Sequence, residues 1–154
     1  MRTIIIDTVQ ATVRAILIKK DKGGQSASLD SARAVAGGLM GDHHTGFSKK
    51  RQILLLSGSV LDELKLAPGS IYENVVIDGI DVMGLQEGQN LRLGEALVTV
   101  TIPCEPCIQM ERIRQGLRGS LQNRRGMFVR VVAEGTVRVG DPVEIVQETS
   151  SQSR

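Results

Sequence analysis

The stretch ALVTVTI at residues 96–102 decides the fold class, because it is the clearest strand pattern in the chain. Thr99 and Thr101 alternate with apolar side chains along it. Alternation with a period of two is typical of a β-strand that turns one face to a core. We therefore expect strands, rather than helices, to dominate the fold.

Short apolar and β-branched runs flank this strand on both sides, separated by Gly, Pro and charged residues that are typical of turns. The run Ile53–Leu56 is continuously apolar and predicts a strand buried on both faces. About eight short strands favour a β-barrel or sandwich over an α/β sheet. The further predicted strands are residues 13–18, 32–36, 53–56, 71–77, 91–93, 127–132 and 137–146.

Two helices are expected among these strands. A short one follows Ser57 or Ser59, either of which can serve as its N-cap. The other spans residues 106–117, with Pro106 in its first turn. The predicted fold class is therefore all-β (β-rich α+β), a closed or partly open β-barrel with one or two short helices.

We expect one domain over residues 1–154, with a core at about 13–146 and a flexible tail at 147–154. The charged, Gly-rich and Ser-rich segment 19–28 predicts a loop. No Gly-rich phosphate-binding motif of the dinucleotide or P-loop type is present.

Composition excludes several classes of function. Aromatic residues make up only 2% of the chain, so a stacking platform for single-stranded nucleic acid is not expected. The net charge of +2 is too balanced for a dedicated nucleic-acid or membrane-surface protein. The sequence contains no apolar run long enough to span a membrane and no recognisable signal peptide. We expect a cytoplasmic protein with reduced thiols.

The two cysteines form a C-x-x-C motif, Cys104-Glu105-Pro106-Cys107, between a predicted strand and a predicted helix. A thiol at a helix N-terminus lies near free N–H groups, which favour the thiolate. The helix dipole contributes only about 0.3–1 kcal/mol, so a thiolate at neutral pH also needs a neighbouring cation. The candidate cations are Lys49, Lys50, Arg51, Arg112 and Arg114.

Such a thiolate could carry a persulfide, form a disulfide with its neighbour or bind a soft metal. A buried, inert cysteine pair is the alternative. The missing βαβ context argues against a thioredoxin-like redox site. A structural zinc site would need Cys104, Cys107, His43 and His44, but adjacent histidines lack the usual H-x3–5-H spacing.

Both histidines of the chain lie in the loop GDHHTG at residues 41–46. Its glycines permit close approach of a ligand. Asp42 could accept the N–H of one imidazole and fix its tautomer. The loop is therefore either a polar wall of a small-molecule pocket or a turn in which Asp42 makes an Asx-type bond and His43 and His44 face water.

Glu73 and Asn74 precede the apolar run that begins at Val75. Both are poor strand formers, so their position needs a reason. We expect a buried hydrogen-bond network that clamps a loop, in preference to an exposed strand face.

The order and spacing of these segments resemble the MOSC family, the C-terminal domain of molybdenum-cofactor sulfurases, over about residues 13–146. Two positions depart from the family pattern. His43 stands where the family usually has Arg, which removes a fixed positive charge, and Tyr72 stands where it often has Gly. The matching segments are 38–46, Arg51, 54–57, 68–69, 73–74, 79–80, 85–88, 93–94, 103–107, 130–132, Gly135 and 139–143.

The resemblance implies a β-barrel whose pocket carries sulfur or binds the molybdenum cofactor (molybdopterin). The family cysteine matches Cys107, which is implied as the sulfur acceptor or the molybdenum ligand, with Cys104 as an auxiliary thiol. The other implied pocket residues are Asp42, His43, His44, Glu73 and Asn74, with Arg51 or Arg112 contacting a phosphate.

The resemblance also implies partners. A chain of 154 residues has no room for the pyridoxal-phosphate domain of the eukaryotic sulfurases, so sulfur would come in trans from a cysteine desulfurase or other sulfur donor. The recipient would be a molybdenum-cofactor protein. The rivals are a small molybdoenzyme that reduces N-hydroxylated compounds and a non-catalytic binding module with a structural C-x-x-C. Whether the chain is an enzyme stays open at this point.

Overall fold

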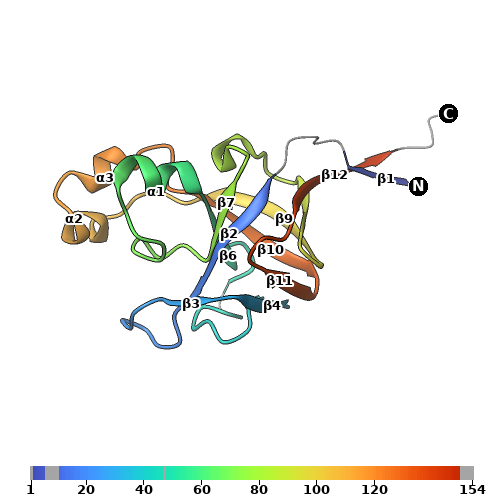
Figure 1. Cartoon of the computed structure of the whole chain (residues 1–154), viewed down its shortest axis with the longest axis horizontal. Helices are drawn as coiled ribbons and strands as arrows, with labels where there is room; N and C mark the ends of the chain where they lie inside the picture. Colours follow the sequence, from blue (N-terminus) through green and yellow to red (C-terminus); the bar gives the residue numbers. More distant parts are fainter. Residues whose placement is uncertain (1, 6–10, 47, 150–154) are drawn as a thin grey trace.

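The computed structural model describes residues 2–5, 11–46 and 48–149, which form two β-sheets with a group of short helices at one end (Figure 1). In the described residues the larger sheet has the strand order β1-β12-β8-β9-β10-β6-β7-β2-β3, and the smaller one β11-β4-β5. The strands are β1 (Arg2–Ile5), β2 (Thr12–Ile18), β3 (Ala27–Leu29), β4 (Ser31–Val35), β5 (Gly38–Leu39), β6 (Ile53–Ser57), β7 (Val75–Asp78), β8 (Asn90–Leu93), β9 (Ala96–Pro103), β10 (Met127–Ala133), β11 (Gly135–Arg138) and β12 (Val143–Thr149). The helices are α1 (Gly58–Leu64), α2 (Gln109–Ile113) and α3 (Leu117–Ser120), with a 3-10 turn η1 (Val82–Gly84).

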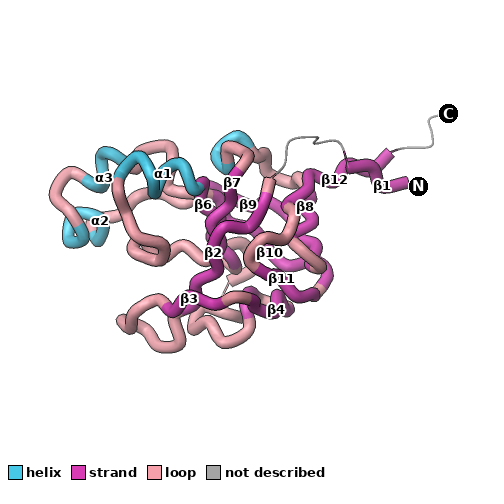
Figure 2. The backbone as a smooth tube through the Cα atoms, in the orientation of Figure 1, coloured by secondary structure: helices cyan, strands magenta, loops and turns pink. Residues whose placement is uncertain are grey.

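Neighbouring strands of the larger sheet run antiparallel, apart from the parallel pair β6 and β7. A parallel pair needs a crossover connection, because the chain must return to the same end of the sheet. Helix α1 and the loop after it supply that connection (Figure 2). Because strands outnumber the short helices in the described residues, the predicted strand-rich fold is confirmed.

The larger sheet curls so that the start of β2 approaches the turn before β12. Thr12 bridges Pro142, and the N–H of Val13 donates to the carbonyl of Asp141 at 2.9 Å. This contact is an isolated bridge and not a paired strand, so closure into a barrel remains a prediction.

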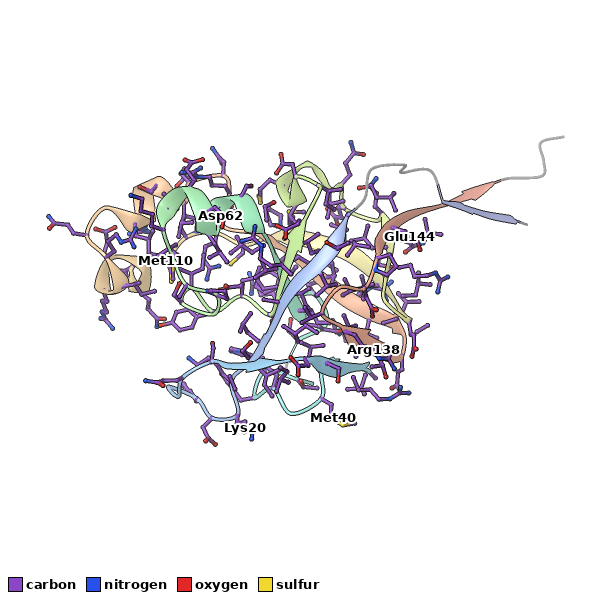
Figure 3. All side chains as sticks on the ribbon, in the orientation of Figure 1. Lys20, Met40, Asp62, Met110, Arg138 and Glu144 are labelled. Carbon is purple, nitrogen blue, oxygen red and sulfur yellow. The ribbon has the colours of Figure 1, made fainter. Side chains whose placement is uncertain are left out.

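Two apolar clusters lie on opposite faces of the sheet, because successive strand residues point to opposite sides. Ile16 and Leu55 belong to the larger cluster, whereas Leu17 and Leu56 belong to the smaller one. Residues 53–56 are buried throughout, as predicted for a strand covered on both faces. Helices α1, α2 and α3 cover the smaller cluster with Val60, Leu61, Met110 and Leu117. Figure 3 shows Met110 at the helical end, far from Lys20 and Met40.

The predicted single helix over residues 106–117 is wrong, since this segment contains α2 and the start of α3. Arg114 is extended, and Gly116 adopts a left-handed conformation at φ 85°. The Glu111 carboxylate accepts the N–H groups of Gly116 and Arg118 at 2.9 and 2.8 Å, which stabilises the break. The described residues therefore contain three short α-helices where the sequence predicts one or two.

Several predicted boundaries also differ. The strand expected from residue 71 begins at Val75, because Tyr72 has a φ of 69° that no regular strand accommodates. The predicted loop 19–28 contains the start of β3. Residues 147–149, predicted as part of a flexible tail, end β12, and the rest of that predicted tail lies outside the described residues.

Candidate functional site

Two adjoining pockets share His44 of the GDHHTG loop and Tyr72, and the larger of them also reaches α2. We call the smaller one, of about 170 Å³, the inner pocket. Its walls are His44, Arg51, Gln52, Leu54, Tyr72, Asn74, Cys104, Arg125 and Phe128. The larger one, of about 560 Å³, is the outer pocket. Its walls are Lys19, Lys22, Gly23, His43, His44, Tyr72, Gln109, Arg112 and Ile113.

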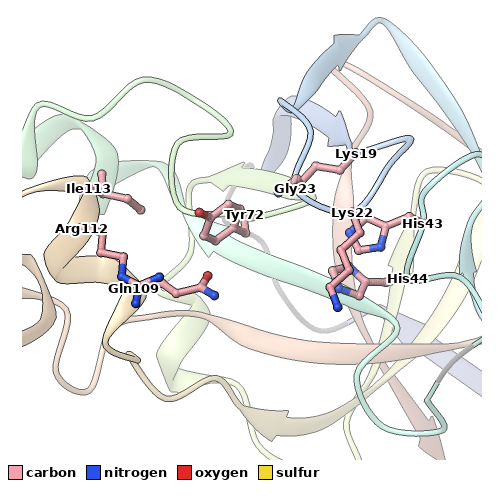
Figure 4. A pocket seen from close by; sticks show the side chains of 9 residues that line it. All are labelled: Lys19, Lys22, Gly23, His43, His44, Tyr72, Gln109, Arg112 and Ile113. Atoms are coloured by element: carbon pink, nitrogen blue, oxygen red, sulfur yellow. The ribbon is translucent and has the colours of Figure 1, made fainter.

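The outer pocket has basic groups on both sides. Figure 4 shows Arg112 on the helical side and Lys22 with the two histidines on the opposite side, with Tyr72 between them. The ammonium of Lys19 lies 4.3 Å from the centre of the Tyr72 ring, within the range of a cation–π contact. None of its lining residues is acidic, so the pocket favours an anionic ligand.

Cys104 is the cysteine that reaches the inner pocket. It follows Pro103 at the end of β9, and its main-chain N–H donates to the carbonyl of Gly126 at 2.9 Å. Burial raises the pKa of this thiol above its ordinary value, while the charges of Arg125 and Arg51 oppose the rise. The free Cys104 thiol is therefore protonated at neutral pH.

Cys107 is exposed, and it lines neither of the two pockets. It also does not head the predicted long helix, because α2 begins two residues later and has only five residues. The helix-dipole argument for a Cys107 thiolate therefore loses its basis.

Arg125 is a buried charged residue of the inner pocket that is not among the residues predicted from the sequence. Only 4% of it is exposed, and its Nε and Nη1 have no hydrogen-bond partner among the described residues. A buried guanidinium is normally paired, because leaving it unpaired costs several kcal/mol in desolvation. Such an orphaned donor pair marks a position where an anion would be stabilised. In the sequence, Arg125 is only one of two adjacent arginines before a strand, so no pattern distinguishes it.

Gly126 explains how Arg125 and Cys104 come together. Its φ of 119° lies in a region that other residues rarely adopt, and a Cβ at this position would clash with the carbonyl oxygen of Leu55. The backbone after Arg125 therefore lies directly against β6. The carbonyl of Gly126 also accepts the Cys104 N–H, so the backbone at Gly126 positions the side chains of both Cys104 and Arg125.

Glu73 forms the buried network expected from the sequence, although it lines neither the inner nor the outer pocket. It is 1% exposed, and its carboxylate accepts the N–H groups of Gly69 and Ile71 at 2.6 and 3.3 Å. Burial raises the pKa of this carboxyl, and its backbone bonds and the charge of Arg125 act in the opposite direction. Its contacts hold the turn before β7.

Asn74 lines the inner pocket, but its amide joins two strands. Its Oδ1 accepts the Leu54 N–H at 3.0 Å, and its Nδ2 donates to the Leu17 carbonyl at 3.1 Å. The side chain therefore links β2 to β6 and forms one wall of the pocket.

The GDHHTG loop combines features of both expected alternatives. Asp42 is buried, and its Oδ1 accepts the Lys19 N–H at 2.9 Å while its Oδ2 accepts the His44 N–H at 3.2 Å, which is an Asx-type bond. The His44 Nδ1 lies 3.8 Å from Asp42 Oδ2, too far to fix a tautomer by a hydrogen bond. Desolvation, with the charges of His43 and Lys19, lowers the pKa of His44, so this imidazole is neutral at pH 7. Both histidines nevertheless line pockets.

The MOSC domain family model matches residues 42–144, which is most of the chain and includes every residue that lines the inner pocket. This chain belongs to the MOSC domain family. Among curated proteins, none matches it at a significant level.

Solved structures share the fold of this chain. The YuaD protein from Bacillus subtilis is similar, with a TM-score of 0.78 and 20% identity over 96% of this chain and 99% of that one. YiiM from Escherichia coli has a TM-score of 0.68 and 23% identity, over 90% and 71% of the two chains. YiiM from Geobacillus stearothermophilus has a TM-score of 0.72 and 17% identity, over 89% and 75%. At these identities the likeness shows the fold alone.

The MOSC fold brings some predicted site residues together and separates others. His44, Arg51, Asn74 and Cys104 meet in the inner pocket, and His43 and Arg112 lie in the outer pocket. Asp42 and Glu73 are buried supports, and Cys107 is exposed.

The MOSC family is linked to molybdenum-cofactor binding, and the site chemistry fits such a group. The fit rests on the soft thiol of Cys104, the unpaired guanidinium nitrogens of Arg125 and the basic outer pocket. Over residues 2–5, 11–46 and 48–149, no group of three or more His, Cys, Asp or Glu side chains could hold a metal ion, so the zinc alternative gains no support. In the same part of the chain, no helix has the length and apolar character to cross a membrane.

Proposed function

We propose that this MOSC domain is a sulfur carrier that receives sulfur as a cysteine persulfide and delivers it to a molybdenum–sulfur cofactor. The donor is a separate protein such as a cysteine desulfurase. The observation that carries the proposal is the position of the Cys104 thiol, in a small pocket with Arg51 and with the buried Arg125, whose Nε and Nη1 have no partner among the described residues.

The surroundings of Cys104 favour an anionic persulfide over an anionic thiol. Burial keeps the thiol protonated by raising its pKa. A persulfide is a stronger acid than its parent thiol, so it ionises more readily in the same position. Its terminal sulfur would extend further into the inner pocket, where Arg51 and Arg125 stabilise negative charge. The pocket is thus better suited to holding the sulfur-loaded form than the empty one.

The two cysteines divide the work in this proposal. Cys107 is exposed and therefore accessible to a protein donor, whereas Cys104 lies in the pocket. The Cys104 thiol gives its proton to a base, for which the neutral imidazole of His44 in the same pocket is available, and the thiolate attacks the terminal sulfur of a Cys107 persulfide. A new bond forms to Cys104 Sγ, the bond to Cys107 Sγ breaks, and Cys107 leaves as a thiolate. No outside oxidant or reductant is needed.

The outer pocket is the proposed binding place of the cofactor. Its volume of about 560 Å³ is typical of small-molecule sites, and Lys19, Lys22 and Arg112 would bind the cofactor phosphate. When bound, the cofactor supplies a redox-active metal centre. The residues of this chain orient it and hold the sulfur anion beside it.

The test is persulfide loading of the reduced protein by a cysteine desulfurase and free cysteine, followed by intact mass measurement. We expect a gain of one sulfur atom that is lost on reduction. Peptide mapping of a matched pair, Cys104→Ser and Cys107→Ser, assigns the sulfur. The unmodified protein should hold it on Cys104, and Cys107→Ser should load more slowly from the desulfurase.

A protein that gains no sulfur atom would contradict the carrier role. Stable loading of Cys104→Ser to the same level as the unmodified protein would instead make Cys107 the storage position. Elemental analysis of protein from a cofactor-producing host tests the cofactor separately. An Arg112→Gln variant should retain less molybdenum than the unmodified protein, with its persulfide loading unchanged.

A further inference from the structure

We propose that the inner pocket takes a small sulfur oxyanion of the thiosulfate type as a direct sulfur donor to Cys104. This inference rests on the proposed function, because it names a substrate class for the same thiol. It differs from the proposed function in the source of sulfur, because the oxyanion replaces the donor protein.

The first support is the charge state of the pocket. Arg125 is buried, and its Nε and Nη1 find no partner in the part of the chain that the structure describes. Arg51 adds a second guanidinium, and the pocket walls contain no carboxylate. Glu73 acts on Arg125 through space, but its two oxygens already accept the N–H groups of Gly69 and Ile71. Glu105 also acts on the Cys104 thiol, but it is exposed and does not line the inner pocket. Two guanidinium groups against one occupied and one exposed carboxylate favour an anionic ligand.

The second support is size. The inner pocket holds about 170 Å³, well below the roughly 300–1,000 Å³ typical of sites for drug-sized ligands. A pterin cofactor therefore suits the outer pocket, and a ligand of a few heavy atoms suits the inner one. An oxyanion with three oxygens on one sulfur matches the forked donors of a guanidinium.

The third support is that a nucleophile and a base line the same pocket. Cys104 provides the thiol, which faces the Glu105 carbonyl at 3.8 Å, and the neutral imidazole of His44 is the base in the same pocket that would accept its proton. The Cys104 thiolate then attacks the outer, sulfane sulfur of thiosulfate. A bond forms between that sulfur and Cys104 Sγ, and its bond to the sulfonate sulfur breaks. The electron pair leaves with sulfite, and Cys104 keeps an anionic persulfide.

Arg51 and Arg125 would assist this step because the leaving sulfite carries away two negative charges. The reaction conserves charge and needs no oxidant, since sulfite departs with the electrons of the broken bond. The product is the same loaded form that the proposed carrier function requires.

The experiment uses the full, reduced chain with thiosulfate alone and no desulfurase. We expect one sulfur atom added per chain by intact mass, and one equivalent of sulfite released. Added cyanide should remove the sulfur as thiocyanate and permit repeated turnover. Cys104→Ser should abolish both products, whereas Cys107→Ser should retain them.

Arg125→Gln tests the anion site. It should raise the thiosulfate concentration for half-maximal rate by at least about tenfold, since a charged hydrogen-bond donor is removed. Arg124→Gln is the matched control, because the neighbouring Arg124 pairs with Glu63 and lines neither pocket. Should Arg125→Gln fail to fold, sulfate competition on the unmodified protein replaces it, and sulfate should inhibit competitively against thiosulfate.

The outcomes separate the two proposals. Loading by desulfurase but not by thiosulfate overturns this inference and leaves the proposed function standing. Loading by neither overturns both. Competition by phosphate without any sulfur transfer from thiosulfate identifies the pocket as a phosphate site and overturns the donor class, as does thiosulfate-derived sulfur found only on Cys107.

Discussion

The main-chain N–H of Cys104 donates to the carbonyl of Gly126 at 2.9 Å, which joins the end of β9 to the start of β10. Arg125 directly precedes this glycine, so a single backbone bond sets the thiol and the buried guanidinium side by side. The two residues are far from the GDHHTG loop in sequence, yet His44 completes the same pocket. Much of what we expect from variants follows from this arrangement.

Gly126→Ala should destabilise the protein strongly. Its positive φ alone costs about 1–2 kcal/mol for alanine, and the contact with the Leu55 carbonyl adds roughly 1–3 kcal/mol of overpacking. Gly116→Ala is the control, because Gly116 also has a positive φ but no heavy atom of the described structure lies within 4 Å of an added Cβ. Urea unfolding measures both variants. If both variants lost the same free energy of unfolding, the backbone at Gly126 would not lie tightly against β6.

Asn74→Ala should lower the free energy of unfolding by about 2 kcal/mol or more. The change leaves the Leu54 N–H and the Leu17 carbonyl without their side-chain partner in a buried region. Gln122→Ala, at an exposed position after α3, serves as a control and should be nearly neutral. Thermal and urea unfolding report the difference, and a neutral Asn74→Ala would contradict the proposed link between β2 and β6.

Alkylation should distinguish the two cysteines. Cys104 should react with iodoacetamide more slowly than Cys107 at pH 7–8, because burial raises its pKa and only Cys107 is exposed. Arg125→Gln should slow Cys104 further, since the guanidinium charge lowers that pKa. Peptide mass analysis over a pH series measures both rates. Faster labelling of Cys104 at neutral pH would show that its thiol is already ionised.

Stability should fall at acid pH in part through Glu111. Hydrogen bonds from the Gly116 and Arg118 N–H groups lower the pKa of this carboxyl below its ordinary value of 4.5. A lowered pKa gives stability that is present above pH 4.5 and is lost as the pH falls through the folded-state pKa. The stability gap between the unmodified protein and Glu111→Gln should therefore close on acidification. Gln122→Ala, which changes no titratable group at an exposed position, is the control, and its stability gap should not change with pH.

Local sequence patterns were sufficient for much of the fold. The alternating run at residues 96–102 lies within β9, and the continuous apolar run Ile53–Leu56 lies in β6 as predicted. Both patterns report directly which strand faces are buried. The helix expected over residues 106–117 failed because Gly116 and the Glu111 side chain end α2 through contacts that periodicity does not reveal.

The candidate site shows a similar division. The order of the segments identified the family, and the family pattern predicted a set of site residues. That set includes His44, Arg51, Asn74 and the cysteine pair. The family pattern pointed to Cys107 as the pocket thiol, and Arg125 carried no signal at all. The wrong choice of cysteine and the missed Arg125 have the same cause. Segment order does not reveal in which direction a single side chain points or how deeply it is buried.

The amino-acid sequence by itself determined the strand pattern, the family and the residue types available for sulfur chemistry, because these depend on local spacing. Only the tertiary structure decided which cysteine lines the inner pocket and which arginine is buried with two nitrogens unpaired among the described residues. The physical reason is that both depend on the close approach of Gly126 to the Leu55 backbone, a contact between segments about seventy residues apart in the chain.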